Sequence, residues 1–107
     1  MPYDHELDAR VTDAVAPLDT VHKRMFGGTC HILHGNMMAG VYKDYLILRL
    51  GEPAAAEALT EPFIRPFDIT GRQMRGWVMV EPPGADGDAL ERWLTLAREY
   101  AESLPPK

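Results

Sequence analysis

Four short runs of β-forming residues lie between residues 20 and 50, and turn-forming residues separate them. Gly35-Asn36 divides the second run from the third, and glycine at the first turn position takes the positive φ of a type II′ hairpin turn. Lys43-Asp44 divides the third run from the fourth and predicts a second turn. This arrangement is typical of an antiparallel meander. The four runs are Val21–Phe26, Thr29–His34, Met37–Tyr42 and Tyr45–Leu50.

Apolar residues at three- and four-residue spacing predict one amphipathic helix before this sheet and one near the end of the chain. The first covers Asp4–Leu18, and the second covers Ala89–Leu104. Asp88, with Glu91 three residues further on, is expected to form a capping box at the start of the second helix. A short middle helix is predicted over Glu52–Leu59, where three alanines raise helix propensity.

The remaining segments complete an α+β fold. Trp77–Val80 predicts a last strand, and two prolines, Pro62 and Pro66, force an extended connector that leaves room for an extra short strand near residues 67–70. We expect an antiparallel β-sheet of about five strands packed against the N-terminal, middle and C-terminal helices, in the order α-β-β-β-β-α-β-α. Because 107 residues that are 46% hydrophobic suit one continuous core, residues 1–107 are expected to form a single domain.

Composition limits the classes of function. A single cysteine, Cys30, excludes an internal disulfide framework, and the acidic N-terminus has no signal-peptide pattern. We therefore expect a cytoplasmic protein that does not span a membrane. The net charge of -5 disfavours a surface that is basic all round, the usual footprint of a nucleic-acid binder. Residues 20–80 are mildly basic, however, with seven basic and five acidic side chains.

Cys30, His31 and His34 are residue types that bind zinc, and a thiol beside imidazoles could also serve as a nucleophile. All three lie in the predicted strand, which keeps their side chains apart. Cys30 and His31 point to opposite faces, and Cys30 lies roughly 13 Å from His34 at about 3.3 Å per residue. We therefore expect no metal ligand and no catalytic residue, and we expect Cys30 to be a small buried residue. A small-molecule or metal-dependent enzyme that uses the Cys30, His31 and His34 region is the alternative.

Gly71 and Gly76 have the spacing of phosphate-binding P-loop glycines, but Trp77-Val78 stands where the loop needs lysine and a hydroxyl residue. Nucleotide binding by that route is excluded, and no cofactor is expected. Arg72 and Arg75 remain as two basic groups that could hold a carboxylate or phosphate of a partner, or pair with an acid of the chain itself.

Five methionines, Met25, Met37, Met38, Met74 and Met79, are expected to fill the core, although thioether side chains also suit adaptable binding surfaces. Trp77 and Trp93 are expected to anchor the core.

An ordered set of motifs runs through almost the whole chain: Arg24–Gly28, Gly35–Met37 with Gly40–Val41, Leu48–Gly51 and Gly71–Val78. This set resembles the N-terminal domain of the TfoX/Sxy family, here as a stand-alone domain that lacks the family's C-terminal domain. The resemblance implies helices packed on an antiparallel sheet, no catalytic residues, and kinship with regulators of natural competence that act with the cyclic-AMP receptor protein.

We therefore expect a non-enzymatic interaction or regulatory domain, a transcription-linked accessory protein, that is a monomer or a homodimer. Its partner is expected to be another protein of the transcription machinery, contacted through a surface that includes Arg24, Arg72 and Arg75. Direct DNA binding is a further alternative, and it predicts an affinity that falls steeply with salt.

Overall fold

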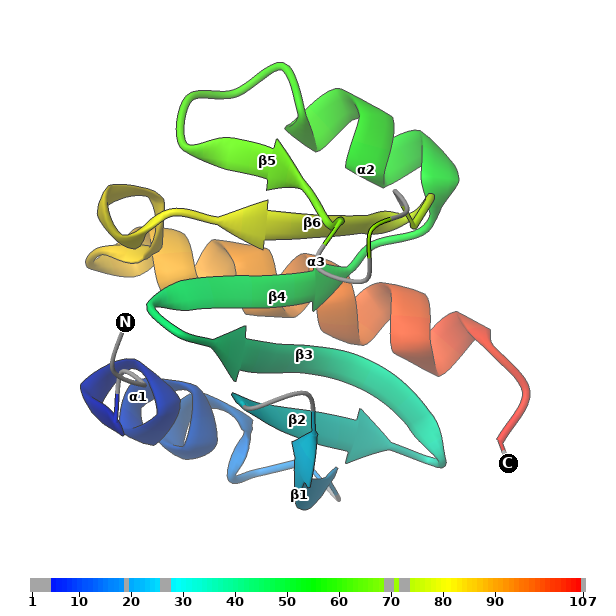
Figure 1. Cartoon of the computed structure of the whole chain (residues 1–107). Helices are drawn as coiled ribbons and strands as arrows, with labels where there is room; N and C mark the ends of the chain where they lie inside the picture. The colour runs from blue at the N-terminus through cyan, green and yellow to red at the C-terminus, as the bar shows by residue number, and fades with distance from the viewer. Residues whose placement is uncertain (1–4, 19, 26–27, 69–70, 72–73, 107) are drawn as a thin grey trace.

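The computed structural model describes residues 5–18, 20–25, 28–68, 71 and 74–106. Its six strands form one antiparallel sheet in the order β1-β2-β3-β4-β6-β5, with three α-helices and a short 3₁₀ helix around it. Figure 1 shows the strands stacked in this order from β1 to β5. The elements are α1 (His5–Val15), β1 (Thr20–Met25), β2 (Gly28–Leu33), β3 (Asn36–Tyr42), β4 (Tyr45–Arg49), α2 (Glu52–Ala58), β5 (Ile64–Pro66), β6 (Trp77–Val80), η1 (Pro82–Ala85) and α3 (Asp88–Ser103).

The main core lies between the sheet and the helices. The helix α3 crosses one face of the sheet, behind the central strands in Figure 1, and α1 packs against α3 and β3. Side chains at alternate strand positions point into this layer, as Leu46 and Leu48 do on β4 and Val78 and Val80 do on β6. Trp93 of α3 is among the largest side chains buried there. Within the described residues, no helix combines the length and apolar character that crossing a membrane requires.

The α+β fold class and the order of the main elements are confirmed, with differences in detail. The sheet has six strands, and the extra strand lies at Ile64–Pro66 instead of near residues 67–70. In the latter range, residues 67 and 68 are not in a strand, and residues 69 and 70 lie outside the described residues. The strand includes Pro66 because β5 is an edge strand, and proline is tolerated at an edge.

The predicted type II′ turn at Gly35-Asn36 is wrong by one residue. Leu33 pairs with Asn36, so His34 and Gly35 are the two central turn residues. Both have positive φ, 54° and 82°, as a type I′ turn requires. Asn36 instead belongs to β3, and its side-chain amide donates a hydrogen bond to the carbonyl oxygen of Pro105 at 3.0 Å.

The predicted capping box of α3 is also wrong. Gly87 is the N-cap residue, and no side chain caps the helix there. Asp88 is the first helical residue, one position too late to cap it, and lies with Glu91 in the first turn. Two carboxylates in this turn still stabilise the positive end of the helix dipole.

The opposite face of the sheet carries a smaller apolar cluster. Ile47, Phe67 and Met79 are its buried members. Around them lie side chains that are only partly buried: Met37, Tyr42, Tyr45 and Trp77. Trp77 therefore belongs to this second face, and its expected place in the main core is wrong. The expected place of Trp93 in the main core is confirmed.

Candidate functional site

The predicted arginine surface is only partly described. Arg72 lies outside the described residues. Arg24 is exposed near the end of the edge strand β1, on the side of the sheet that carries α1, because its cross-strand partner Thr29 contacts Asp8 of α1. Arg75 is exposed in the turn before β6, and its Nη1 lies 3.7 Å from Glu52 Oε1. An ion pair this exposed contributes little to stability, so the guanidinium of Arg75 is available to a partner.

The strand register places Arg24 and Arg75 in different corners of the sheet. Arg24 aligns with Val80 across four strand spacings, whereas Arg75 precedes Val80 by five residues. At about 4.8 Å per strand and 3.3 Å per residue, the two backbones are on the order of 25 Å apart. The two arginines therefore do not belong to one contiguous patch. The pairs that give this alignment are Arg24↔Thr29, Thr29↔Val41, Val41↔Leu46 and Leu46↔Val80.

A hollow of about 210 Å³ lies beside Arg75, between α2 and the segment that leads into β6. Met74 and Trp77 contribute apolar surface from this segment, and Leu59 contributes it from the end of α2. Met74 is 36% exposed, so its expected place in the core is wrong. The hollow thus presents an exposed thioether and an indole next to two opposite charges, those of Arg75 and Glu52.

Trp77 connects this hollow to the second face of the sheet. The Arg49 guanidinium lies 5.5 Å from the Trp77 ring centre, and the Phe67 ring stacks against Trp77 at 5.5 Å. Further along this face, Arg65 lies over Tyr45 and donates a hydrogen bond to its hydroxyl oxygen at 3.0 Å. Arginine and aromatic residues are both enriched at surfaces that bind other proteins.

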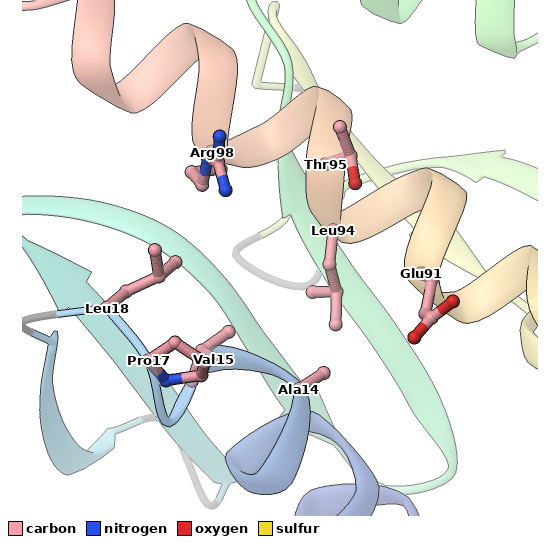
Figure 2. A pocket seen from close by; sticks show the side chains of 8 residues that line it. All are labelled: Ala14, Val15, Pro17, Leu18, Glu91, Leu94, Thr95 and Arg98. Carbon is pink, nitrogen blue, oxygen red and sulfur yellow. The ribbon is translucent and has the colours of Figure 1, made fainter.

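A second hollow, of about 340 Å³, lies between the end of α1 and α3. Figure 2 shows Leu18 and Leu94 lying between these two elements, with Glu91 and Arg98 on the α3 side. Arg98 pairs with Glu102 one turn further along α3. Among the described residues that line this hollow none is aromatic, whereas Trp77 lines the hollow beside α2.

The structure does not bring Cys30, His31 and His34 together. Cys30 and His31 alternate on β2, and only His31 faces α1, where it contacts Asp8. His34 is exposed in the turn beyond β2. Cys30 is fully buried, as expected, and this burial raises the pKa of its thiol.

We expect Cys30 to react with a thiol reagent far more slowly in the folded protein than in the unfolded protein. Burial blocks access of the reagent, and the raised pKa lowers the fraction of reactive thiolate at pH 8. The measurement is the rate of reaction with a chromogenic disulfide, with and without denaturant. We expect a difference of at least about a hundredfold, since the folded protein must open locally before it reacts. Equal rates would contradict the buried position.

His31 instead belongs to a cluster with Asp8 of α1 and His22 of β1. One ligand atom from each of the three residues lies within 4.8 Å of the others. His31 Nε2 lies 3.4 Å from Asp8 Oδ1, and His22 Nε2 lies 3.5 Å from Asp8 Oδ2. The two imidazole rings stack with their centres 4.6 Å apart and an angle of 2° between their planes.

Burial governs the chemistry of this cluster. His31 is 1% exposed, and desolvation, followed by the neighbouring His22, lowers its pKa in spite of the opposing effect of Asp8. His31 is therefore a neutral imidazole at neutral pH. Thr29 Oγ1 donates a hydrogen bond to Asp8 Oδ1 at 2.8 Å and fixes the carboxylate.

His31 was a candidate ligand from the sequence, whereas the places of Asp8 and His22 beside it were not predicted. The usable signal was the antiparallel pairing of two strands that follow each other in the sequence. Met25 of β1 pairs with Gly28 of β2, and three pairs further along His22 faces His31. Asp8 could be added only from the packing of α1 on these two strands.

Among the described residues, an α+β fold thus carries a hollow beside α2, a hollow between α1 and α3, an aromatic sheet face and a carboxylate–imidazole cluster. Residues 13–101 match the family described as the TfoX N-terminal domain. The chain belongs to this family, which is a family of regulatory domains and not a known family of enzymes. Searches of curated proteins and of solved structures found no match.

Proposed function

We propose that this protein is a non-enzymatic regulatory domain that binds another protein, a component linked to transcription. Its contact surface is the hollow beside α2 together with the aromatic sheet face that Trp77 joins to it. The observation that carries the proposal is the exposure of Met74 and Arg75 around that hollow. Membership of a regulatory family supports it.

The residue types of this surface favour a protein partner. Interfaces between proteins are enriched in aromatic residues, methionine and arginine, and truncating such residues often costs more than 1 kcal/mol of binding free energy. Met74, Arg75 and Trp77 lie together in the hollow, and Arg49 stacks on Trp77. The partner that fits this surface presents an apolar side chain beside a carboxylate. A phosphate backbone fits less well, because Glu52 lies beside Arg75 and the chain carries a net charge of -5.

Recovery of partners from a native lysate tests the proposal. The immobilised full chain is compared with Met74→Asp, which puts a charge into the hollow, and with Arg75→Ala. We expect wild type to recover a transcription-linked protein in the presence of nuclease. Met74→Asp is expected to recover at least about tenfold less of it, because a tenfold change needs only about 1.4 kcal/mol.

Two matched variants control for charge alone. Thr95→Asp adds a charge at the hollow between α1 and α3, and Arg98→Ala removes an exposed arginine that is also paired. Both are expected to recover the partner as wild type does. Arg24→Ala and Arg72→Ala test whether the surface extends to the other predicted arginines. Equal recovery by wild type and Met74→Asp would argue against this surface, and recovery lost on nuclease treatment would favour DNA binding.

A further inference from the structure

Asp8, His22 and His31 converge from three different elements at the junction of α1 with strands β1 and β2. His22 and His31 are cross-strand partners, so both rings stand on the face of the sheet that carries α1. Asp8 reaches them from the first turn of α1. From these contacts we propose that Asp8, His22 and His31 bind one divalent transition-metal ion of the zinc class.

The donor set and its spacing suit such an ion. Two imidazoles and one carboxylate are a recurrent set of three protein ligands, with a remaining position for water. In a tetrahedral site with bonds of about 2.0–2.1 Å, neighbouring ligand atoms lie about 3.3–3.4 Å apart. His31 Nε2 lies 3.4 Å from Asp8 Oδ1, and His22 Nε2 lies 3.5 Å from the other oxygen, Oδ2. An ion shared by both nitrogens therefore uses both oxygens of Asp8 or requires the carboxylate to rotate.

The stacked rings require one adjustment. The nitrogen lone pair of an imidazole lies in the plane of its ring, and the two stacked rings lie in separate parallel planes, so a shared ion needs one ring to tilt. The His22 side chain is 45% exposed and can rotate into solvent, whereas His31 is held by burial. The exposed side of His22 also gives the ion and its water a path into the site.

The surroundings prepare the other two ligands. Thr29 holds Asp8 through the hydrogen bond to Oδ1, as partners of metal-bound carboxylates commonly do. The side chain of His31 is 1% exposed, so the surrounding residues hold its ring in place. Nitrogen donors disfavour Mg²⁺ and Ca²⁺, which prefer sites made of oxygen atoms. Zinc, nickel and copper fit the set, and zinc best tolerates a distorted geometry.

The ion would join α1 to the edge of the sheet. Within the described residues β1 pairs only with β2, so it is the outer strand on this side. A bound ion would tie His22 of this strand to the helix through Asp8. The site lies near β1, whereas the hollow beside α2 borders β6, so the two proposals are independent. This one differs from the sequence-based expectation that the chain has no metal ligands.

Calorimetric titration of the tag-free protein with Zn²⁺ tests the site. We expect wild type to bind one ion per chain. His22→Ala removes an exposed ligand, and Asp8→Asn keeps an oxygen that can accept the Thr29 hydrogen bond while it removes the charge. Each variant is expected to bind Zn²⁺ at least about tenfold more weakly than wild type. Even the loss of a residue that only supports a metal ligand typically weakens metal binding by about tenfold or more, and these variants change a ligand itself. Circular dichroism verifies that both remain folded.

His34→Asn is the matched control, because it removes another exposed imidazole and asparagine tolerates the positive φ of 54° at this position. It is expected to bind as wild type does. Titration with Co²⁺ gives an independent measurement. We expect wild type to show the strong visible absorption of tetrahedral Co²⁺, and we expect His22→Ala to lose this absorption. Absence of saturable binding by wild type would overturn the proposal, as would equal affinity of His22→Ala and wild type.

Discussion

Replacing Trp93 with alanine is expected to lower the free energy of unfolding by about 3–5 kcal/mol, the usual cost of deleting a large core side chain. Trp93 is 2% exposed and lies in the main core between α3 and the sheet. Its indole Nε1 donates a hydrogen bond to the carbonyl oxygen of Gly84 at 3.2 Å, which ties α3 to the segment after β6. Small domains are stable by about 5–15 kcal/mol, so this loss is a large part of the total.

Urea denaturation of wild type and variant measures the change. Trp93→Phe is a second variant that keeps most of the ring but loses the hydrogen bond, and about 1 kcal/mol of its cost is expected from that loss. Trp77→Ala is the comparison at the partly buried tryptophan, where we expect less than half of the Trp93→Ala effect. Equal costs at the two tryptophans would contradict the assignment of Trp93 to the main core.

Replacing Gly28 with alanine is expected to cost about 3 kcal/mol, toward the upper end for overpacked positions. Gly28 begins β2, where the neighbouring strand β3 approaches closely. A Cβ atom at this position would lie 1.9 Å from the carbonyl oxygen of Val41. The atom in the way belongs to the backbone, so the strands must separate and weaken the hydrogen bonds between β2 and β3.

Gly87→Ala is the matched control for Gly28→Ala. Gly87 has a positive φ of 56°, but a Cβ atom there would have nothing within 4 Å. With a ψ of -135°, this is a conformation that residues with side chains rarely adopt, so the cost of Gly87→Ala is expected to be about 1–3 kcal/mol from backbone strain alone. Thermal unfolding followed by circular dichroism measures both variants, and little or no loss for Gly28→Ala would show that β3 does not approach Gly28 as described.

The fold could be predicted where the side-chain period was clear. The α3 stripe and the alternation on β4 each match a period that only one type of element produces, so these elements were found within a residue or two at each end. The turn after β2 was placed one residue late because Gly35 can occupy either central position of a two-residue turn. The strand β5 was predicted too late in the sequence. It has only three residues, which is too short to show the alternation of a strand, and its position is defined by backbone pairing with β6.

The candidate sites were harder to predict because they depend on contacts between distant segments. Arg75 was selected as an exposed basic residue, but its neighbours Leu59 and Trp77 come from α2 and β6. The cluster of Asp8, His22 and His31 depends on the β1–β2 register and on the packing of α1, neither of which a single residue encodes. The alternation of a strand was enough, however, to separate Cys30 from His31.

The central proposal is that this regulatory domain binds a protein partner through the hollow beside α2. Its most direct test is the amount of nuclease-resistant partner that Met74→Asp recovers, relative to Thr95→Asp. We expect recovery to fall at least about tenfold for Met74→Asp and to stay at the wild-type level for Thr95→Asp. Equal recovery by the two variants would contradict a contact at this hollow.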